Sequence, residues 1–122
     1  DGSALIYATY LGGTKDDYPH SLIVDKNNEL IVFGSTSSSN YPTTAGAVDS
    51  TYNGGTDILV TKFNATGSNL VASTFIGGSK DDGVNRRDGT SSNKIRNTNY
   101  FYADDYRGEV NLDEDGNVFV AT

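Results

Sequence analysis

A repeated unit constrains this chain more than any other feature, because self-similarity at a fixed spacing indicates a fold built from repeated supersecondary units. Residues 2–17 and 67–82 are identical at nine of sixteen positions, at an offset of 65 residues. Residues 16–34 match residues 104–122 at an offset of 88, so the second copy carries an insertion of 23 residues after Asp82. The 122 residues therefore hold a little under two copies of one unit.

Each unit is rich in β-branched and aromatic runs, and no window shows the apolar period of about 3.6 residues that marks a helix. Tight hairpin turns are expected at 26–28 and 114–116, because Asn and Asp-Gly tolerate the positive φ that such turns need. The sequence predicts the last strand of one unit, four strands of a complete unit, and the first two strands of the next. In chain order the expected strands are 4–11, 20–25, 30–35, 57–64, 70–76, 109–113 and 117–122.

Head-to-tail units of four antiparallel strands are typical of β-propeller blades, with a solenoid or a sandwich as competing all-β folds. A sandwich would not repeat its own sequence, so we predict an all-β propeller fragment of about two blades. In this division, 1–19 holds the outer strand of a preceding blade and a connection. The complete blade is 20–78, the long inserted loop is 79–108, and 109–122 supplies the first two strands of the next blade.

The central strands of the complete blade should carry its more buried side chains. We expect these to include Val24, Val32, Val60 and Phe63. A closed propeller needs about four blades, and at 65 residues each these exceed the 122 residues present. The expectation is a fragment of a larger protein, or else a chain whose open strand edges pair with neighbouring copies.

Several stretches follow the order of a known repeat. They are Gly2-Ser3-Ala4-Leu5, Tyr10-Leu11-Gly12-Gly13, Asp16-Asp17-Tyr18, Ile23-Val24-Asp25, Tyr41-Pro42-Thr43-Thr44, Gly54-Gly55-Thr56-Asp57 and Val60-Thr61-Lys62-Phe63-Asn64. These stretches resemble the SBBP repeat, a β-propeller repeat of large secreted bacterial and archaeal proteins. The resemblance implies a secreted or cell-surface, non-catalytic scaffold and names no ligand. The insertion at 83–103 departs from the repeat pattern.

The amino-acid composition excludes several classes of binding partner and of metal site. The net charge of −7 argues against nucleic acid and anionic membranes as main partners. No apolar run has the length of a membrane span, so no membrane insertion is expected. The chain has no Cys and a single histidine, His20, which excludes thiolate and His-rich metal sites. We expect no cofactor and no enzymatic activity.

Paired carboxylates are the main candidates for catalysis. They stand at Asp16-Asp17, Asp81-Asp82 and Asp104-Asp105, at the same place in each copy. A catalytic pair is needed once, whereas a structural device is needed in every unit. We therefore expect these side chains to accept backbone N–H groups in the turns rather than to act as general acid and base.

A calcium site is the second chemical alternative. Asp113, Asp115 and Asn117 look like half of a calcium loop, but the chain stops before the twelfth position, where a carboxylate ligand is expected. The equivalent turn of the first copy contains Lys26. A hairpin turn accounts for both copies, and a calcium site for only one.

Binding is expected at the long connections, because in a blade alternate connections share one face and loops usually carry function. Loops 36–56 and 79–108 should lie on a common face that contacts a glycan or a surface protein. The expected contact residues are Tyr41, Tyr52, Arg86, Arg87, Tyr100 and Tyr102. Two alternatives stay open: the insertion is a solvated loop, or the chain is a structural fibre subunit that assembles by edge-strand pairing.

Overall fold

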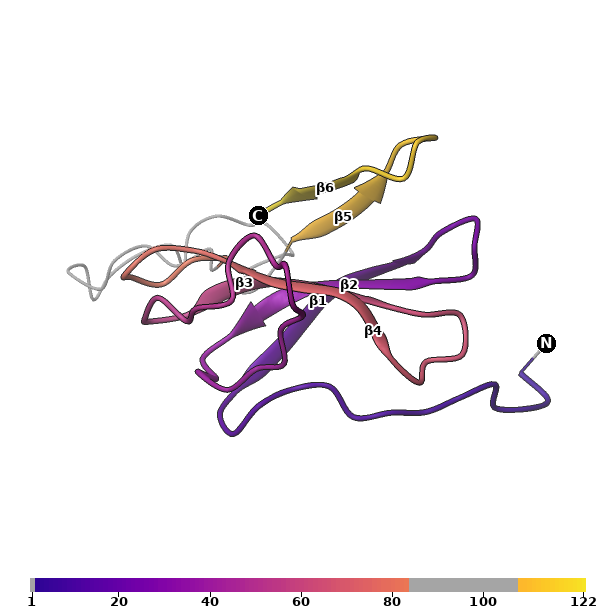
Figure 1. The fold of residues 1–122 in the computed structure, drawn as a ribbon, viewed down its shortest axis with the longest axis horizontal. Helices are drawn as coiled ribbons and strands as arrows, with labels where there is room; N and C mark the ends of the chain where they lie inside the picture. The colour runs from indigo at the N-terminus through magenta and orange to yellow at the C-terminus, as the bar shows by residue number, and fades with distance from the viewer. Residues whose placement is uncertain (1, 84–107) are drawn as a thin grey trace, which may run out of the picture.

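The structure, a computed structural model, describes residues 2–83 and 108–122, and these form six β-strands and no helix (Figure 1). The strands are β1 (Asp17–Val24), β2 (Leu30–Thr36), β3 (Asp57–Phe63), β4 (Leu70–Ile76), β5 (Glu109–Leu112) and β6 (Val118–Ala121). The first four form an antiparallel sheet in chain order, and β5 and β6 form a separate antiparallel pair. The predicted all-β class is confirmed.

Strand β1 starts earlier than the sequence predicts and contains a bulge. Its register against β2 shifts between Pro19 and Ser21, so His20 lies in the bulge. Proline has no backbone N–H to give to a ladder and is tolerated at bulges and on edge strands. Because β1 is an edge strand, the sheet accommodates Pro19 without losing a central hydrogen bond.

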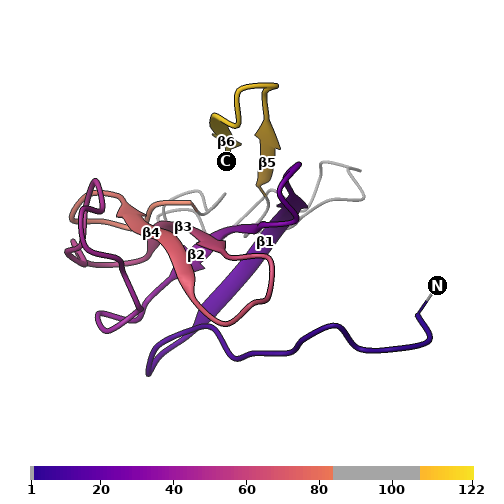
Figure 2. The same ribbon diagram turned by 45° about the vertical axis from the view of Figure 1, so that its right-hand side comes forward.

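The strand predicted for 4–11 is wrong, since residues 2–16 form no strand. The equivalent segment in the second copy, β4, is a strand because β3 pairs with it. Among the described residues nothing takes the place of β3 beside 4–11. The segment instead runs across one face of the sheet (Figures 1 and 2), where the ring of Tyr7 lies against Gly67 and Leu11 joins a core cluster.

Both predicted hairpin turns are present and share one design. In each turn the leading aspartate, Asp25 or Asp113, accepts the backbone N–H groups two and four residues later. The distances are 2.8 and 2.9 Å in the first copy and 3.0 and 2.8 Å in the second. Asn28 (φ 60°) and Gly116 (φ 84°) occupy the left-handed position that the turn requires.

The four-stranded sheet has apolar side chains on both faces. The β5–β6 hairpin lies over one face, and the N-terminal segment runs over part of the other (Figure 2). One face, here called the hairpin-covered face, packs Ile31 and Phe33 against Val110 of β5. The other, here called the opposite face, carries a second cluster of Tyr41, Leu59 and Phe75, together with Leu11 and Tyr52. The sheet is therefore the middle layer of three, between the β5–β6 hairpin and residues 7–11.

The expected core is only partly correct. Phe63 is buried, which confirms that prediction, and Val32 and Val60 are half-buried. The prediction for Val24 is wrong, because its side chain is 55% exposed. Val24 ends the edge strand β1 and points to the opposite face, where residues 7–11 do not reach it.

Burial of Phe33 predicts a large effect of truncation. Its ring is fully buried, so Phe33→Ala should lower the free energy of unfolding by about 3–5 kcal/mol through lost burial and a residual cavity. Tyr10→Ala, at a fully exposed aromatic ring, is the control and should change stability by less than about 0.5 kcal/mol. Urea unfolding followed by circular dichroism measures both, and equal effects would contradict this core assignment.

An ion pair clamps the β1–β2 turn to β3. Lys62 Nζ lies 2.8 Å from Asp25 Oδ2 and 2.7 Å from Glu29 Oε2. The hydrogen bond from Lys62, followed by the N–H of Glu29, lowers the pKa of Asp25 from 3.8 to about 2. A carboxyl whose pKa is depressed on folding stabilises the fold above its unfolded pKa and loses that contribution as pH falls through the folded value.

This shift predicts a pH dependence. Between about pH 4 and pH 2 the free energy of unfolding should fall more steeply for the wild-type chain than for Asp25→Asn, which has no proton to take up at this position. Asp115→Asn, an exposed carboxyl in the equivalent turn, is the matched control and should keep the wild-type slope. Parallel slopes for wild type and Asp25→Asn in urea titrations would refute the assignment.

Candidate functional site

The long connections meet at one end of the four-stranded sheet, here called the loop end. The β2–β3 connection, 37–56, and residues 77–83 after β4 both leave the sheet there, and the backbone N–H of Asp82 donates to the carbonyl of Thr56 at 2.5 Å. The short turns 25–29 and 64–69 lie at the other end. Arg86, Arg87, Tyr100 and Tyr102 lie outside the described residues.

The repeated carboxylates cap the Gly-Gly turns at the loop end. Asp17 Oδ2 accepts the N–H of Gly13 at 2.8 Å, and Asp82 Oδ2 accepts the N–H of Gly78 at 2.6 Å. Asp17 also accepts two hydroxyl groups, from Thr36 at 2.5 Å and Ser38 at 3.2 Å. These carboxylates hold the same turn in each copy, and this geometry favours the structural role over general acid–base chemistry. The third pair, Asp104-Asp105, lies outside the described residues.

Asp57 is the most buried carboxyl at the loop end. Its Oδ2 accepts the N–H of Asn53 at 2.7 Å, while its Oδ1 has no hydrogen-bond partner among the described residues. Burial raises its pKa, and the nearby charges of Asp82 and Asp49 act in the same direction. A metal ion would favour the charged form, but residues 2–83 and 108–122 contain no cluster of three His, Asp or Glu side chains that could hold one.

Tyr41 is a core residue as well as a loop residue. Its side chain is 5% exposed, and its hydroxyl lies 3.0 Å from Thr61 Oγ1, which in turn lies 2.9 Å from Ser73 Oγ. Ser73 Oγ donates to the carbonyl of Pro42 at 2.7 Å, which closes a buried polar network between the loop and β3–β4. Burial raises the pKa of Tyr41 to about 12. Through these contacts Tyr41 anchors the loop to β3 and β4.

Tyr52 also holds the loop in place, although it is half-buried. Its ring packs edge-on against Phe75, with centroids 6.2 Å apart, and its hydroxyl donates to the carbonyl of Gly55. The aromatic residues expected to form a contact surface therefore fix the loop in the described part of the chain. Of Tyr41 and Tyr52, only Tyr52 keeps its side chain partly exposed at the loop end.

At the candidate calcium site, both carboxylate oxygens of Asp113 accept hydrogen bonds from N–H groups. Asp113 Oδ1 accepts the backbone N–H groups of Asp115 and Asn117, and its Oδ2 accepts the Asn117 side-chain amide at 2.7 Å. The Asn117 side-chain bond is the main cause of a lowered Asp113 pKa. A carboxylate engaged in this way stabilises a hairpin turn, which supports the structural alternative.

His20 packs against its own sheet. Its ring meets Phe33 edge-on, with centroids 5.3 Å apart, and Nε2 lies 3.1 Å from Ser35 Oγ. Ser35 is fully buried on the hairpin-covered face. These contacts give His20 a packing role on the hairpin-covered face.

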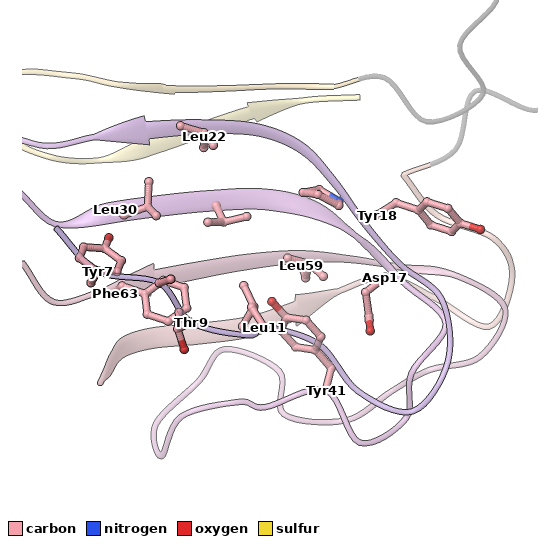
Figure 3. A pocket seen from close by; sticks show the side chains of 13 residues that line it. Tyr7, Thr9, Leu11, Asp17, Tyr18, Leu22, Leu30, Tyr41, Leu59 and Phe63 are labelled. Carbon is pink, nitrogen blue, oxygen red and sulfur yellow. The ribbon is translucent and has the colours of Figure 1, made fainter. Parts of the chain in front are cut away.

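An apolar groove of about 460 Å³ on the opposite face was not predicted (Figure 3). Residues 7–9 and Leu11 form one wall, and Leu22, Leu30 and Val32 form the other. Its floor includes Leu59 and Phe63. The available signal was the run Leu22-Ile23-Val24, because a strand with consecutive apolar residues has two faces to bury.

Comparison with protein-family models, curated proteins and solved structures gave no match. Within residues 2–83 and 108–122, no helix is long and apolar enough to cross a bilayer.

The capping role of the carboxylates predicts a contrast between neighbouring residues. Asp17→Asn should lower the free energy of unfolding by about 1–3 kcal/mol, because one amide replaces an oxygen that accepts N–H and O–H donors. Asp16→Asn, at an exposed carboxyl, is the matched control and should stay within about 0.5 kcal/mol. Chemical denaturation of both variants measures this difference. If Asp17→Asn changes the free energy of unfolding as little as Asp16→Asn does, Asp17 does not stabilise the turn by capping it.

Proposed function

We propose that this chain is a non-catalytic β-propeller scaffold or adhesion module of a secreted or cell-surface protein, built from repeats of the SBBP type. In this proposal it is a fragment of a larger protein, and the four-stranded sheet is one blade. The β5–β6 pair is then the inner half of the next blade. Binding to a protein or a glycan takes place at the loop end.

One observation carries the propeller part of the proposal, namely that the two units stack in register. Ser21 Oγ donates to Glu109 Oε2 at 3.4 Å, and Lys26 Nζ donates to the Glu114 carbonyl at 3.2 Å. Both contacts join residues 88 apart, which is the offset between the matching parts of the two copies. Each residue thus contacts its own equivalent in the next unit, as expected where successive blades stack face to face.

The distribution of loop length supports binding at the loop end. At the other end the connections are tight turns held by Asp25, Asn64 and Asp113. At the loop end the chain spends about twenty residues on the β2–β3 connection, and the 23-residue insertion follows β4. Long connections on a rigid sheet are where binding residues concentrate. Four of the nine basic residues fall in the insertion, which suits an acidic glycan or protein.

A fibre subunit that assembles by edge-strand pairing is the second candidate. The outer edge of β4 is already hydrogen-bonded by the preceding loop, through Thr44 N to Ser73 O at 3.1 Å and Phe75 N to Asp49 O at 2.9 Å. That edge is therefore not open to a neighbouring strand. Strand β1, which pairs with β2 alone, and strand β6, which pairs with β5 alone among the described strands, are the edges that favour this candidate.

The basic insertion gives the test of the binding function. Arg86→Ala with Arg87→Ala should weaken binding to acidic glycans or to host-surface protein at least about tenfold, because two cations leave the proposed contact face. Glycan-array and surface-binding measurements provide the readout. Lys26→Ala, at the opposite end of the sheet, is the control and should bind like wild type. Unchanged binding by the double variant would contradict the binding role and favour the alternative that the insertion is a solvated loop.

A further inference from the structure

Asp57 has one carboxylate oxygen that the fold leaves without a hydrogen bond. The side chain is fully buried at the start of β3, and its Oδ1 has no hydrogen-bond partner within the described part of the chain. A buried carboxylate that has lost its hydration is costly when it is charged and much less so when it is protonated. The geometry at Oδ1 therefore requires either a positive charge or a proton.

A second carboxylate, that of Asp82, approaches the same place. A side-chain carbon added at Gly77 would overlap Asp57 Oδ1 and would lie 3.0 Å from Asp82 Oδ2, so the two oxygens converge on this glycine. Only glycine leaves room there for both carboxylates. Two carboxylates that meet away from water repel each other when both are charged, and one proton shared between them removes the repulsion.

The titratable groups on the elements packed around Asp57 are carboxylates. Asp82 faces it from the turn after β4, and Asp49 acts on it from the β2–β3 loop. On the side of β2 its ladder partner is Thr36, whose hydroxyl donates to the carboxylate of Asp17 on β1. Each of these carboxylates makes a negative charge on Asp57 less favourable.

The basic residue of the same turn, Lys80, does not compensate this charge. It is exposed, and it meets the β2–β3 loop through its backbone at Gly55. No ion pair within residues 2–83 and 108–122 includes Asp57, and no group of carboxylates in these residues could hold a metal ion. A proton is therefore the partner that fits Oδ1.

The two carboxylates belong to two segments that are joined at the loop end. Asp57 Oδ2 accepts the N–H of Asn53 at 2.7 Å and so holds the β2–β3 loop. Asp82 Oδ2 accepts the N–H of Gly78 at 2.6 Å and holds the turn after β4. The backbone N–H of Asp82 donates to the carbonyl of Thr56 at 2.5 Å and joins the loop to the turn. Repulsion between the two carboxylates therefore acts directly on this junction.

We propose that Asp57 is a proton-operated latch at the loop end, which carries a proton on Oδ1 facing Asp82 and opens the junction of loop and turn when this proton is lost. With the proton in place, one neutral and one charged carboxyl group lie side by side, and the bond from Asp82 to Thr56 forms. When the proton leaves to solvent water, two negative charges face each other and the turn moves away. The latch uses only one sheet and its own connections. It goes beyond the scaffold function, because it makes the loop end respond to pH.

The direction of the pH dependence follows from the burial of Asp57. Burial raises its pKa against the lowering effect of the Asn53 N–H, and the charges of Asp82 and Asp49 raise the pKa further. The folded chain thus keeps this proton at pH values where the unfolded chain has lost it. The stabilisation is present at low pH and is lost as pH rises through the folded pKa. The contribution of Asp25 has the opposite sign, since it is lost on acidification, so the two effects can be separated.

An NMR titration of the side-chain carboxyl carbons of the full chain measures the proton directly. Asp57 should titrate at least about one pH unit above the ordinary aspartate value of about 3.9, and the Asp82 signal should change in the same step. Asp82→Asn removes the facing charge and should lower the pH at which Asp57 titrates. Asp81→Asn, at an exposed neighbouring carboxyl, is the control and should leave the Asp57 titration unchanged. A smaller shift of Asp57 in the wild-type chain would overturn the proposal.

Hydrogen exchange of the Asp82 amide tests the opening. Its protection, corrected for the intrinsic pH dependence of exchange, should fall at least about tenfold as pH rises through the Asp57 titration. Asp57→Asn has an uncharged side chain at every pH and keeps a donor for Asp82, so its protection should stay constant. Wild-type protection that does not change with pH, or that falls equally in Asp57→Asn, would overturn the proposal. If Asp57→Asn does not fold, the titrations of wild type and Asp82→Asn decide.

Discussion

The need to cover both faces of one β-sheet determines most of this structure. Strand β1 carries Leu22, Ile23 and Val24 in succession, so neither face can be left to water without exposing apolar side chains. The hairpin β5–β6 covers one face through Val110, and residues 7–11 with Tyr41 cover part of the other. A sheet of this kind is a layer in a stack, and it gains stability from the layers on either side.

Two small polar contacts mark the register of the stack, beside the apolar surface. Apolar burial has little directional preference, so it would tolerate a shifted hairpin. The Ser21–Glu109 and Lys26–Glu114 contacts connect equivalent positions in this alignment. The turns contribute to this precision, because Asp25 and Asp113 close the same hairpin with the same pair of N–H bonds. A repeated sequence thus yields repeated geometry that matches itself when stacked.

The sequence predicts strands and turns well where neighbouring residues determine them. It predicts them poorly where the result depends on contact with a segment far away in the chain. Strand β4 and the turns at Asn28 and Gly116 followed from residue pattern and positive φ. The strand at 4–11 was wrong because a strand requires a neighbour, and Val24 was misplaced because its exposure depends on which layer lies above it. The sequence suggests Tyr41 as a contact residue because it lies in a loop. Its burial depends on Thr61 and Ser73, which are far away in the sequence and which no local pattern reveals.

The two ends of the sheet differ in how much change they can accept. At the hairpin end, Lys26 reaches the turn of the next unit, so an insertion there would break the contact that sets the register. At the loop end, Asp17 and Asp82 secure the Gly-Gly turns locally, and the chain beyond them can lengthen without moving a strand. The 23-residue insertion begins at this end, directly after Asp82. The insertion of the second copy therefore begins at the end of the sheet where binding is proposed, while the strand positions that stack stay apolar in both copies.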